Sequence, residues 1–300
     1  MSLSSTSSAQ RLRELLAAPG LLTMPCCFDA LSARLIERAG FPLTFMSGFA
    51  VSAARLGLPD TGLISYGEMV AQGRDICSAV RIPVLGDGDT GYGNALNVRR
   101  TVRGYAAAGF ACIMIEDQEA PKRCGHTRGK RVVERAEALQ RIRAAVDERE
   151  AGTDILIMAR TDARRTNGLE EALERCRAFA DLGADMLFLE APHSRAEMER
   201  FCRELPGHKM ANMLEQGDTP ILPPAELSAI GFKIAAYPLT LLGSAIGAMQ
   251  AALVRLRAGL PAQGLPDFAA LREIVGFDDY DRELAHYDPS YHCPVRPRGD

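Results

Sequence analysis

The stretch AAGFACIMIE, residues 107 to 116, decides the fold of this chain. It joins the end of a helix-patterned segment, closed by Gly109, to a short apolar run that ends in the carboxylate of Glu116. A glycine suits the left-handed residue after a helix, and a short apolar run without helical spacing is typical of a buried strand. The same layout returns in RAGFPLTFMS (residues 38–47) and DLGADMLFLE (residues 181–190). The chain therefore repeats a helix-to-strand unit.

Apolar runs of strand length alternate with amphipathic helical segments along most of the sequence. In chain order the runs are LLTMP, LTFMS, IPVLGD, CIMIED, ILIMAR, DMLFLE, HKMAN and FKIAA. This number of units predicts an α/β fold of the (β/α)8 TIM-barrel type, and an open doubly wound sheet is the alternative. We expect residues 1–300 to form a single barrel domain with a helical extension over about 240–300.

The segment NGLEEALERCRAFADLG, residues 167–183, shows the expected helix ends. Asn167 can cap the start, Glu170 and Glu171 favour the positive end of the helix dipole, and Gly183 suits the left-handed residue after the helix.

Composition excludes several classes of protein. The 35 basic and 38 acidic residues give a net charge of −3, which does not indicate nucleic acid or an anionic membrane as a partner. The apolar runs fall short of the roughly 18 residues of a membrane span, and the polar start has no signal-peptide core, so we expect a cytoplasmic protein. The 8 cysteines form no CxxC pair, which favours reduced thiols over a disulfide framework.

Polar residues end six of the predicted strands. Because the carboxyl ends of parallel strands meet at one mouth of a barrel, we expect these side chains to build an active site together. They are Ser47, Asp87, Glu116, Arg160, Glu190 and Asn212.

The loop VLGDGDTGYG, residues 84–93, contains a literal G-x-G-x-x-G but does not fit a dinucleotide. Asp87 and Asp89 would set negative charge against the phosphates, whereas carboxylates between glycines that let a ligand approach suit a hard divalent cation. Asp60 in GLPDTG and Glu116 can complete such a site. For Mg2+ we expect Asp87 to bind directly and the other three carboxylates to act mainly through water.

The basic loop PKRCGHTRGK, residues 121–130, surrounds one thiol with cations. Such cations favour the thiolate of Cys124, so the thiol can act as a nucleophile or as an acid and base, while the loop can equally capture an anionic substrate.

Two further features suit a small carboxylate. Arg160 can clamp it in bidentate fashion, and the Ser47-Gly48 turn offers a hydroxyl and backbone amides.

Together these motifs resemble the isocitrate lyase and phosphoenolpyruvate mutase superfamily over roughly residues 15–290. The stretches that carry the resemblance are SGFAVSAARLGLPDTG, GDGDTGYG, IEDQEAPKRCGH, MARTDA, LFLEAP and ANMLEQGDTP. It implies a barrel whose last helix is exchanged between subunits, a homotetramer built as a dimer of helix-swapped dimers, and a small-molecule di- or tricarboxylate substrate. It also implies Mg2+, for which Mn2+ can substitute, holding a 2-oxo acid or its enolate.

Within that superfamily K-[KR]-C-G-H marks the carbon–carbon bond lyases, and here it reads Lys122 to His126. The resemblance implies that Cys124 is the general acid on a lid, with Lys122, Arg160 and Glu190 as the other catalytic candidates. It assigns substrate binding to Ser47, Gly48, Phe49, Gly125, His126, Arg160 and Asn212.

The residues after Ser47-Gly48 bear on the substrate. Phe49 and Ala50 stand where methylisocitrate lyases usually have glycines. The stretches SGFAVSAARLGLPD, HTRGK and ANMLEQG look nearer to those of lyases of 2-alkylmalates and 2,3-dimethylmalate. We expect Mg2+-dependent cleavage of a 2-hydroxy di- or tricarboxylate to a 2-oxo acid, such as pyruvate, and a carboxylate. An oxaloacetate decarboxylase or hydrolase, or a phosphonate mutase or hydrolase, is the alternative on the same fold. A non-catalytic scaffold would have no reason to keep this set of motifs.

Overall fold

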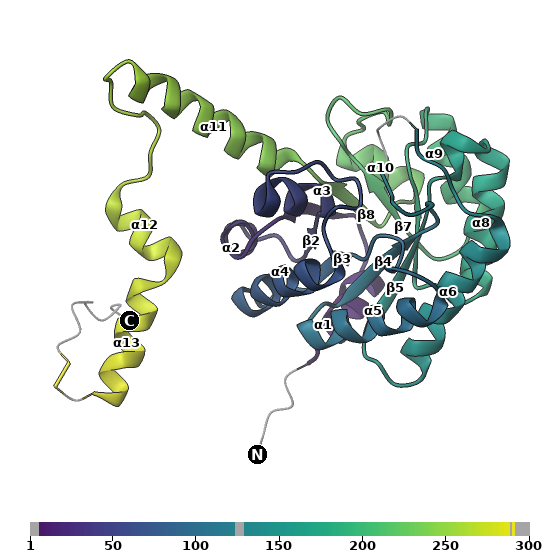
Figure 1. Cartoon of the computed structure of the whole chain (residues 1–300), viewed down its shortest axis with the longest axis horizontal. Helices are drawn as coiled ribbons and strands as arrows, with labels where there is room; N and C mark the ends of the chain where they lie inside the picture. The colour runs from purple at the N-terminus through teal and green to yellow at the C-terminus, as the bar shows by residue number, and fades with distance from the viewer. Residues whose placement is uncertain (1–5, 124–128, 289, 292–300) are drawn as a thin grey trace. The chain divides into compact units, whose positions relative to one another are not determined.

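The computed structural model describes residues 6–123, 129–288 and 290–291. Parallel strands close into a barrel in chain order, β1 through β8, and helices surround them (Figure 1). The closed barrel confirms the predicted fold class and excludes the open sheet. The strands are β1 (Leu22–Cys27), β2 (Thr44–Met46), β3 (Val84–Asp87), β4 (Cys112–Glu116), β5 (Leu156–Thr161), β6 (Met186–Leu189), β7 (His208–Asn212) and β8 (Ile234–Tyr237).

A helix follows each strand, and short extra turns lie in the loops after β2 and β5. The helices up to β8 are α1 (Ser8–Ala17), α2 (Ala30–Arg38), α3 (Gly48–Val51), the π-helix η1 (Ser52–Leu56), α4 (Tyr66–Ala79), α5 (Ala95–Ala108), α6 (Arg135–Glu150), α7 (Ala163–Thr166), α8 (Leu169–Asp181), α9 (Arg195–Glu204) and α10 (Pro224–Ile230). The chain continues with α11 (Thr240–Arg257), α12 (Phe268–Val275) and α13 (Phe277–Tyr287).

The strands are buried on both faces, as β4 illustrates. Ile113 and Ile115 belong to the apolar cluster shared with the outer helices. Cys112 and Met114 belong to a second cluster, which fills the inside of the barrel. This alternation is why the strand reads as a continuous apolar run, because both of its faces meet apolar side chains.

Helix α1 closes the amino-terminal end of the barrel. Its Leu12 and Leu16 are buried in the inner cluster. Just before β8, the Lys233 ammonium donates to the backbone carbonyl of Gly20, at 2.9 Å, in the segment that follows α1. At the other end of the barrel the carboxyl ends of the strands meet, which is where barrels of this type place their active sites.

The predicted cap at Asn167 is wrong. Gly168 is the residue before α8, and no side chain caps that helix. The Asn167 side-chain oxygen instead accepts a hydrogen bond from the Thr166 hydroxyl at 2.6 Å, and its amide closes the turn of α7 onto Ala163. Glu170 and Glu171 do lie in the first turn of α8, and Gly183 has a left-handed φ of 95°.

The chain divides into two units, Met1–Ser244 and Ala245–Asp300. The second holds most of α11 together with α12 and α13. The assignment of the whole chain to one domain stays a prediction, as does the exchange of a helix between subunits. In the described part of the chain, no helix combines the length and the apolar character needed to cross a membrane.

Candidate active site

The six polar strand ends predicted from the sequence line one pocket at the mouth of the barrel. Each lies two positions after a side chain of the inner cluster, so the two-residue period of the strand turns it inward. The pairs of inner residue and polar end are Phe45 and Ser47, Leu85 and Asp87, Met114 and Glu116, Met158 and Arg160, Phe188 and Glu190, and Met210 and Asn212. Convergence of these side chains follows directly from closure of the barrel.

Two carboxylates of the predicted metal site, those of Asp60 and Asp89, form ion pairs with the Lys122 ammonium. Lys122 Nζ lies 2.6 Å from Asp60 Oδ1 and 2.9 Å from Asp89 Oδ1, and all three side chains are almost fully buried. Burial lowers the pKa of Lys122, but the carboxylates of Asp89, Asp87 and Asp60 outweigh this effect and raise it well above its usual value. Lys122 is therefore a cation held inside an acidic cluster.

Asp87 is seated by neighbours on two sides. Tyr105 donates its hydroxyl to the Asp87 backbone carbonyl at 2.6 Å, which fixes the end of β3. A Cβ atom added to Gly48 would lie 2.4 Å from Asp87 Oδ2. The missing side chain of Gly48 therefore leaves the space that the Asp87 carboxylate occupies.

The loop after β3 is held in a constrained shape. Asp89 has a left-handed φ of 48° and Tyr92 one of 59°, a conformation that is uncommon for residues other than glycine. The Asp89 backbone carbonyl accepts the amide of Glu116 at 2.9 Å, so this loop is tied to the end of β4. Strain of this kind in a non-glycine residue is typical of a functional site.

The glycines of this loop serve packing instead of ligand approach. A Cβ at Gly88 would lie 2.6 Å from the Met114 carbonyl oxygen, and one at Gly86 would lie 2.6 Å from the Phe110 ring. The first two glycines of the G-x-G-x-x-G pattern thus allow close packing, Gly86 against the Phe110 ring and Gly88 against β4.

The acidic cluster fits a hard divalent cation. Asp60 Oδ1, Asp89 Oδ1 and Glu116 Oε1 are buried and receive no hydrogen bond of acceptable geometry within the described residues, although the first two lie beside the Lys122 ammonium. Buried carboxylate oxygens without donors are unfavourable unless a cation or water satisfies them. Within the same residues, no three acidic, histidine or cysteine side chains are arranged to hold a metal as a set. This arrangement suits Mg2+, which retains several of its waters.

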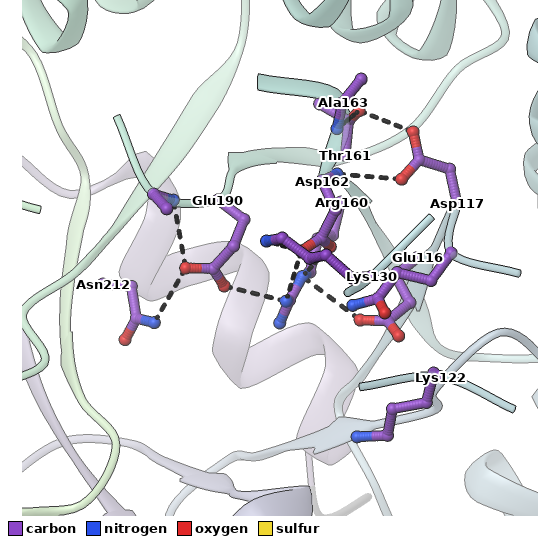
Figure 2. A network of polar contacts seen from close by, with 12 residues as sticks. Glu116, Asp117, Lys122, Lys130, Arg160, Thr161, Asp162, Ala163, Glu190 and Asn212 are labelled. Carbon is purple, nitrogen blue, oxygen red and sulfur yellow. Dashed lines mark hydrogen bonds and ion pairs between the residues drawn. The ribbon is translucent and has the colours of Figure 1, made fainter. Parts of the chain in front are cut away.

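Arg160 lies beside three carboxylates (Figure 2). Its Nε donates to Asp162 Oδ2 at 2.8 Å and lies 3.3 Å from Glu116 Oε2, while Nη2 lies 3.0 Å from Glu190 Oε2. Burial raises the pKa of Glu116 well above its usual range, and the Arg160 guanidinium opposes that shift. The bidentate edge of Arg160 is thus taken by the chain's own Asp162, a partner that sequence reasoning missed.

Asp162 is fixed in turn by a second buried cation. Lys130 Nζ lies 2.6 Å from Asp162 Oδ1, and neither side chain is more than 1% exposed. The backbone amide of Asp162 donates to Asp117 Oδ1 at 2.9 Å. Burial opposes ionisation of Asp162, but Arg160 and Lys130 hold its pKa well below the usual value.

Two of the five cations predicted to act on Cys124 are therefore already engaged. Lys122 is paired with Asp60 and Asp89, and Lys130 is paired with Asp162. Cys124, Gly125 and His126 lie outside the described residues. Just before them, the Gln118 side chain binds both backbone groups of Arg123. It accepts a hydrogen bond from the Arg123 amide at 2.9 Å and donates one to the Arg123 carbonyl at 2.8 Å.

Among the described residues that line the pocket, charge lies on one side. The ionisable lining residues come from the ends of β3 to β6 and from the loops after β2 and β4: Asp60, Asp87, Glu116, Lys122, Arg123, Arg160 and Glu190. At β7, β8, β1 and the end of β2 the lining is neutral: Met210, Asn212, Leu214, Ala236, Pro238, Leu239, Cys26, Phe45, Ser47 and Phe49. A ligand with an anionic end and an apolar end matches this division.

The chain resembles characterised sequences along almost its whole length. A family model described as phosphoenolpyruvate phosphomutase matches residues 12–257. The 2,3-dimethylmalate lyase of Eubacterium barkeri is 43% identical over 93% of this chain and 98% of its own length. A probable 2-methylisocitrate lyase of Corynebacterium glutamicum is 44% identical over 97% of this chain and 96% of its own length.

Solved structures agree with the barrel. A crystal structure of 2,3-dimethylmalate lyase aligns with a TM-score of 0.91 at 36% identity, over 98% of this chain and 100% of that one. Oxaloacetate acetylhydrolase bound to 3,3-difluorooxaloacetate aligns with a TM-score of 0.89 at 37% identity, covering 94% and 97%. Phosphonopyruvate hydrolase bound to oxalate and Mg2+ aligns with a TM-score of 0.82 at 30% identity, covering 93% and 98%.

Proposed function

Because the chain belongs to the phosphoenolpyruvate mutase and isocitrate lyase superfamily, we propose that it is a Mg2+-dependent lyase that cleaves a substituted malate. The substrates are 2,3-dimethylmalate, a 2-alkylmalate or a compound of the 2-methylisocitrate type. The products are a 2-oxo acid such as pyruvate and a simple carboxylate. We keep a cytoplasmic location as a prediction from the sequence.

The observation that carries this proposal is the division of the mouth into a charged and a neutral side. The carboxylates and 2-hydroxyl of a malate belong on the side of β3 to β6, where Asp87, Glu116 and Arg160 lie. An alkyl substituent belongs against Leu214 and Leu239, after β7 and β8. Within the proposed set, 2,3-dimethylmalate and 2-alkylmalates fit this division better than the tricarboxylate 2-methylisocitrate. Its third carboxylate would place charge on the neutral side, which has no cation among the described lining residues.

Asp87 would bind Mg2+ directly, and Asp60, Asp89 and Glu116 would bind it through water. When bound, Mg2+ lowers the pKa of the substrate hydroxyl and stabilises the oxygen of the 2-oxo product. Ser47, Gly48 and Phe49 bind the carboxylate next to the hydroxyl, at the turn where the Ser47 hydroxyl accepts the amide of Ala50 at 3.4 Å.

In the reaction the bond between C2 and C3 breaks and its electron pair passes to C3. The hydroxyl proton passes to solvent as the C2–O bond becomes the carbonyl of the 2-oxo acid. Arg160 retains Nη1 for the developing carboxylate, since this nitrogen donates no hydrogen bond to any of the described residues. Backbone amides at Gly125 and His126 assist it, and Cys124 gives its proton to C3. Glu190 and Asn212 complete the lining, with Lys122 holding Asp60 and Asp89 in place.

The test is a Mg2+-supplemented assay for 2-oxo acid release. The panel contains 2,3-dimethylmalate, 2-alkylmalates, 2-methylisocitrate, isocitrate, oxaloacetate and phosphonopyruvate. We expect turnover of a substituted malate, and loss of that turnover by several orders of magnitude in Cys124→Ser with the fold retained, because a misplaced or absent proton donor removes general acid catalysis. Near wild-type turnover by Cys124→Ser would rule out the general acid.

A second candidate is a hydrolase of oxaloacetate or phosphonopyruvate. The likeness to oxaloacetate acetylhydrolase and phosphonopyruvate hydrolase favours it, since both share the barrel at 30% identity or more. Turnover confined to oxaloacetate or phosphonopyruvate would select this candidate and leave Cys124 without the role proposed for it.

We further propose that the carboxyl-terminal helices bind a second copy of the chain, in a tetramer of helix-swapped dimers. Large apolar side chains of α11 to α13 are exposed to an extent that monomeric proteins seldom show. They include Ile246, Met249, Leu253, Val254, Leu256, Phe268, Leu271, Val275, Phe277 and Tyr280.

A further inference from the structure

Lys130 and Asp162, which are drawn in Figure 2, form an ion pair whose two side chains are almost completely buried. Their Nζ and Oδ1 atoms are 2.6 Å apart, and the two side chains are 1% and 0% exposed. Removing two charges from water costs several kcal/mol per ion unless further hydrogen bonds satisfy them. A deeply buried ion pair is therefore weak evidence for a stabilising role, and we looked for another role for this one.

The further bonds of Asp162 lead to Arg160. The carboxylate accepts Arg160 Nε at 2.8 Å and Nη2 at 3.1 Å, which is the planar two-bond geometry of a guanidinium–carboxylate pair. Asp162 is itself held through its amide by Asp117, whose other oxygen accepts the Thr161 hydroxyl at 2.6 Å. The orientation of Arg160 is thus set from behind the pocket.

Lys130 balances the charge of a carboxylate that Arg160 would otherwise have to neutralise alone. Arg160 faces the carboxylates of Asp162, Glu116 and Glu190. Lys130 offsets the charge of Asp162, so that Arg160 keeps part of its own charge for a ligand. Without Lys130, Asp162 would have Arg160 as its one cationic contact in the described structure and would draw the guanidinium away from the mouth.

We propose that Lys130 and Asp162 are positioning residues, which hold Arg160 so that its Nη1 edge binds a carboxylate of the substrate. The inference rests on the proposed function to the extent that Arg160 binds a carboxylate. Neither residue lines the pocket at the strand ends, and both act through Arg160, which does line it.

The experiment measures oxalate binding by calorimetry in the presence of Mg2+, because oxalate is a small dicarboxylate whose binding requires no turnover. We expect Lys130→Met to weaken oxalate binding about tenfold, the scale of one charge-assisted hydrogen bond. Lys130→Arg keeps the cation and should restore affinity to within about threefold. Where a substrate is turned over, Lys130→Met should raise KM more than it lowers kcat.

Arg131→Met is the matched control. It removes a cation at the next position, but the pair that Arg131 forms with Glu119 is exposed, at 79% and 41%. We expect its oxalate affinity to equal that of the unaltered chain. Asp162→Asn is a second variant of the pair, which keeps the shape of the side chain while removing its charge, and it should weaken oxalate binding as Lys130→Met does.

Wild-type oxalate affinity in folded Lys130→Met would overturn the inference. So would loss of the fold, judged by circular dichroism, in Lys130→Met, Lys130→Arg and Asp162→Asn alike, since the pair would then be structural. Absence of oxalate binding by the unaltered chain would overturn it as well, because Arg160 would hold no carboxylate. The lyase proposal fails separately, if malates are not cleaved while Lys130→Met still weakens oxalate binding.

Discussion

Gly48 shows how much a single residue can decide in this pocket. Its backbone φ is not left-handed, so the chain conformation alone does not require glycine there. The requirement comes from Asp87, whose carboxylate oxygen would lie 2.4 Å from an added Cβ. The proposed direct metal ligand and the proposed carboxylate-binding turn therefore depend on each other for space.

Gly48→Ala should displace Asp87 and lower Mg2+-dependent turnover by roughly 100-fold, the scale of a 1 Å misplacement. The displaced side chain borders the pocket, so we expect a small change in the thermal midpoint. Steady-state kinetics with Mg2+ titration measures the effect.

Gly67→Ala is the control for this change. It adds the same methyl group to an exposed position of α4, where the nearest atom, Ser65 Oγ, is 4.0 Å away. Its turnover should match the unaltered chain, and its helix should gain about 0.5–1 kcal/mol. Unchanged turnover and Mg2+ affinity in Gly48→Ala would show that Asp87 adapts, against the crowding argument.

At the scale of the element, β7 joins two different environments. Its last residue, Asn212, lines the mouth, whereas its first, His208, lies at the opposite end, where β8 begins with Lys233 before it. Partial burial, followed by the charges of Lys233 and Lys209, lowers the pKa of His208 below its usual 6.5. The folded strand therefore favours neutral His208.

This shift predicts how stability depends on pH. Below about pH 6.5 the unfolded chain gains a proton on His208 that the folded chain does not yet bind, so stability falls as the pH decreases from 6.5 toward the lower folded pKa. His208→Gln should lose less of its thermal midpoint than the unaltered chain between pH 7.5 and pH 5.5. An equal loss in both proteins would assign the acid sensitivity to other groups.

At the scale of the whole molecule, the barrel unit is self-sufficient and the second unit is not. Residues of the first unit fill an inner and an outer apolar cluster. No side chain of α12 is buried, and α13 buries only Asp281 within the described residues. Helices without a buried apolar face gain little from tertiary packing, which is the main source of helix stability in proteins.

Association of copies through these helices has a direct test. Leu253→Glu puts a charge into the exposed apolar row of α11, where Leu253 is 64% exposed, and should shift the chain to smaller species in sedimentation velocity. Ala251→Glu adds the same charge at an exposed position on the opposite face of α11 and should leave the assembly size unchanged. Identical sedimentation of the two variants would argue against an interface at Leu253.

Much of this protein was determined by its sequence alone. Helix-ending glycines and apolar runs predicted the closed barrel, because both signals depend on neighbours close in the chain. The period of two residues along each strand then carried Ser47, Asp87, Glu116, Arg160, Glu190 and Asn212 to one mouth. The sequence also indicated the acidic loop, but it did not indicate that Gly86 and Gly88 pack against Phe110 and β4, because these contacts arise only on folding.

The electrostatic connections were decided by the tertiary structure. Lys122 meets Asp60 across 62 positions of the chain, and Lys130 meets Asp162 across 32. No local pattern distinguishes these lysines from the other cations of the basic loop. From the sequence, every one of those cations was equally able to act on Cys124. Closure of the barrel brings particular carboxylates within ion-pair distance of each one, and low solvent exposure then makes those pairings strong enough to fix which cation serves which part of the site.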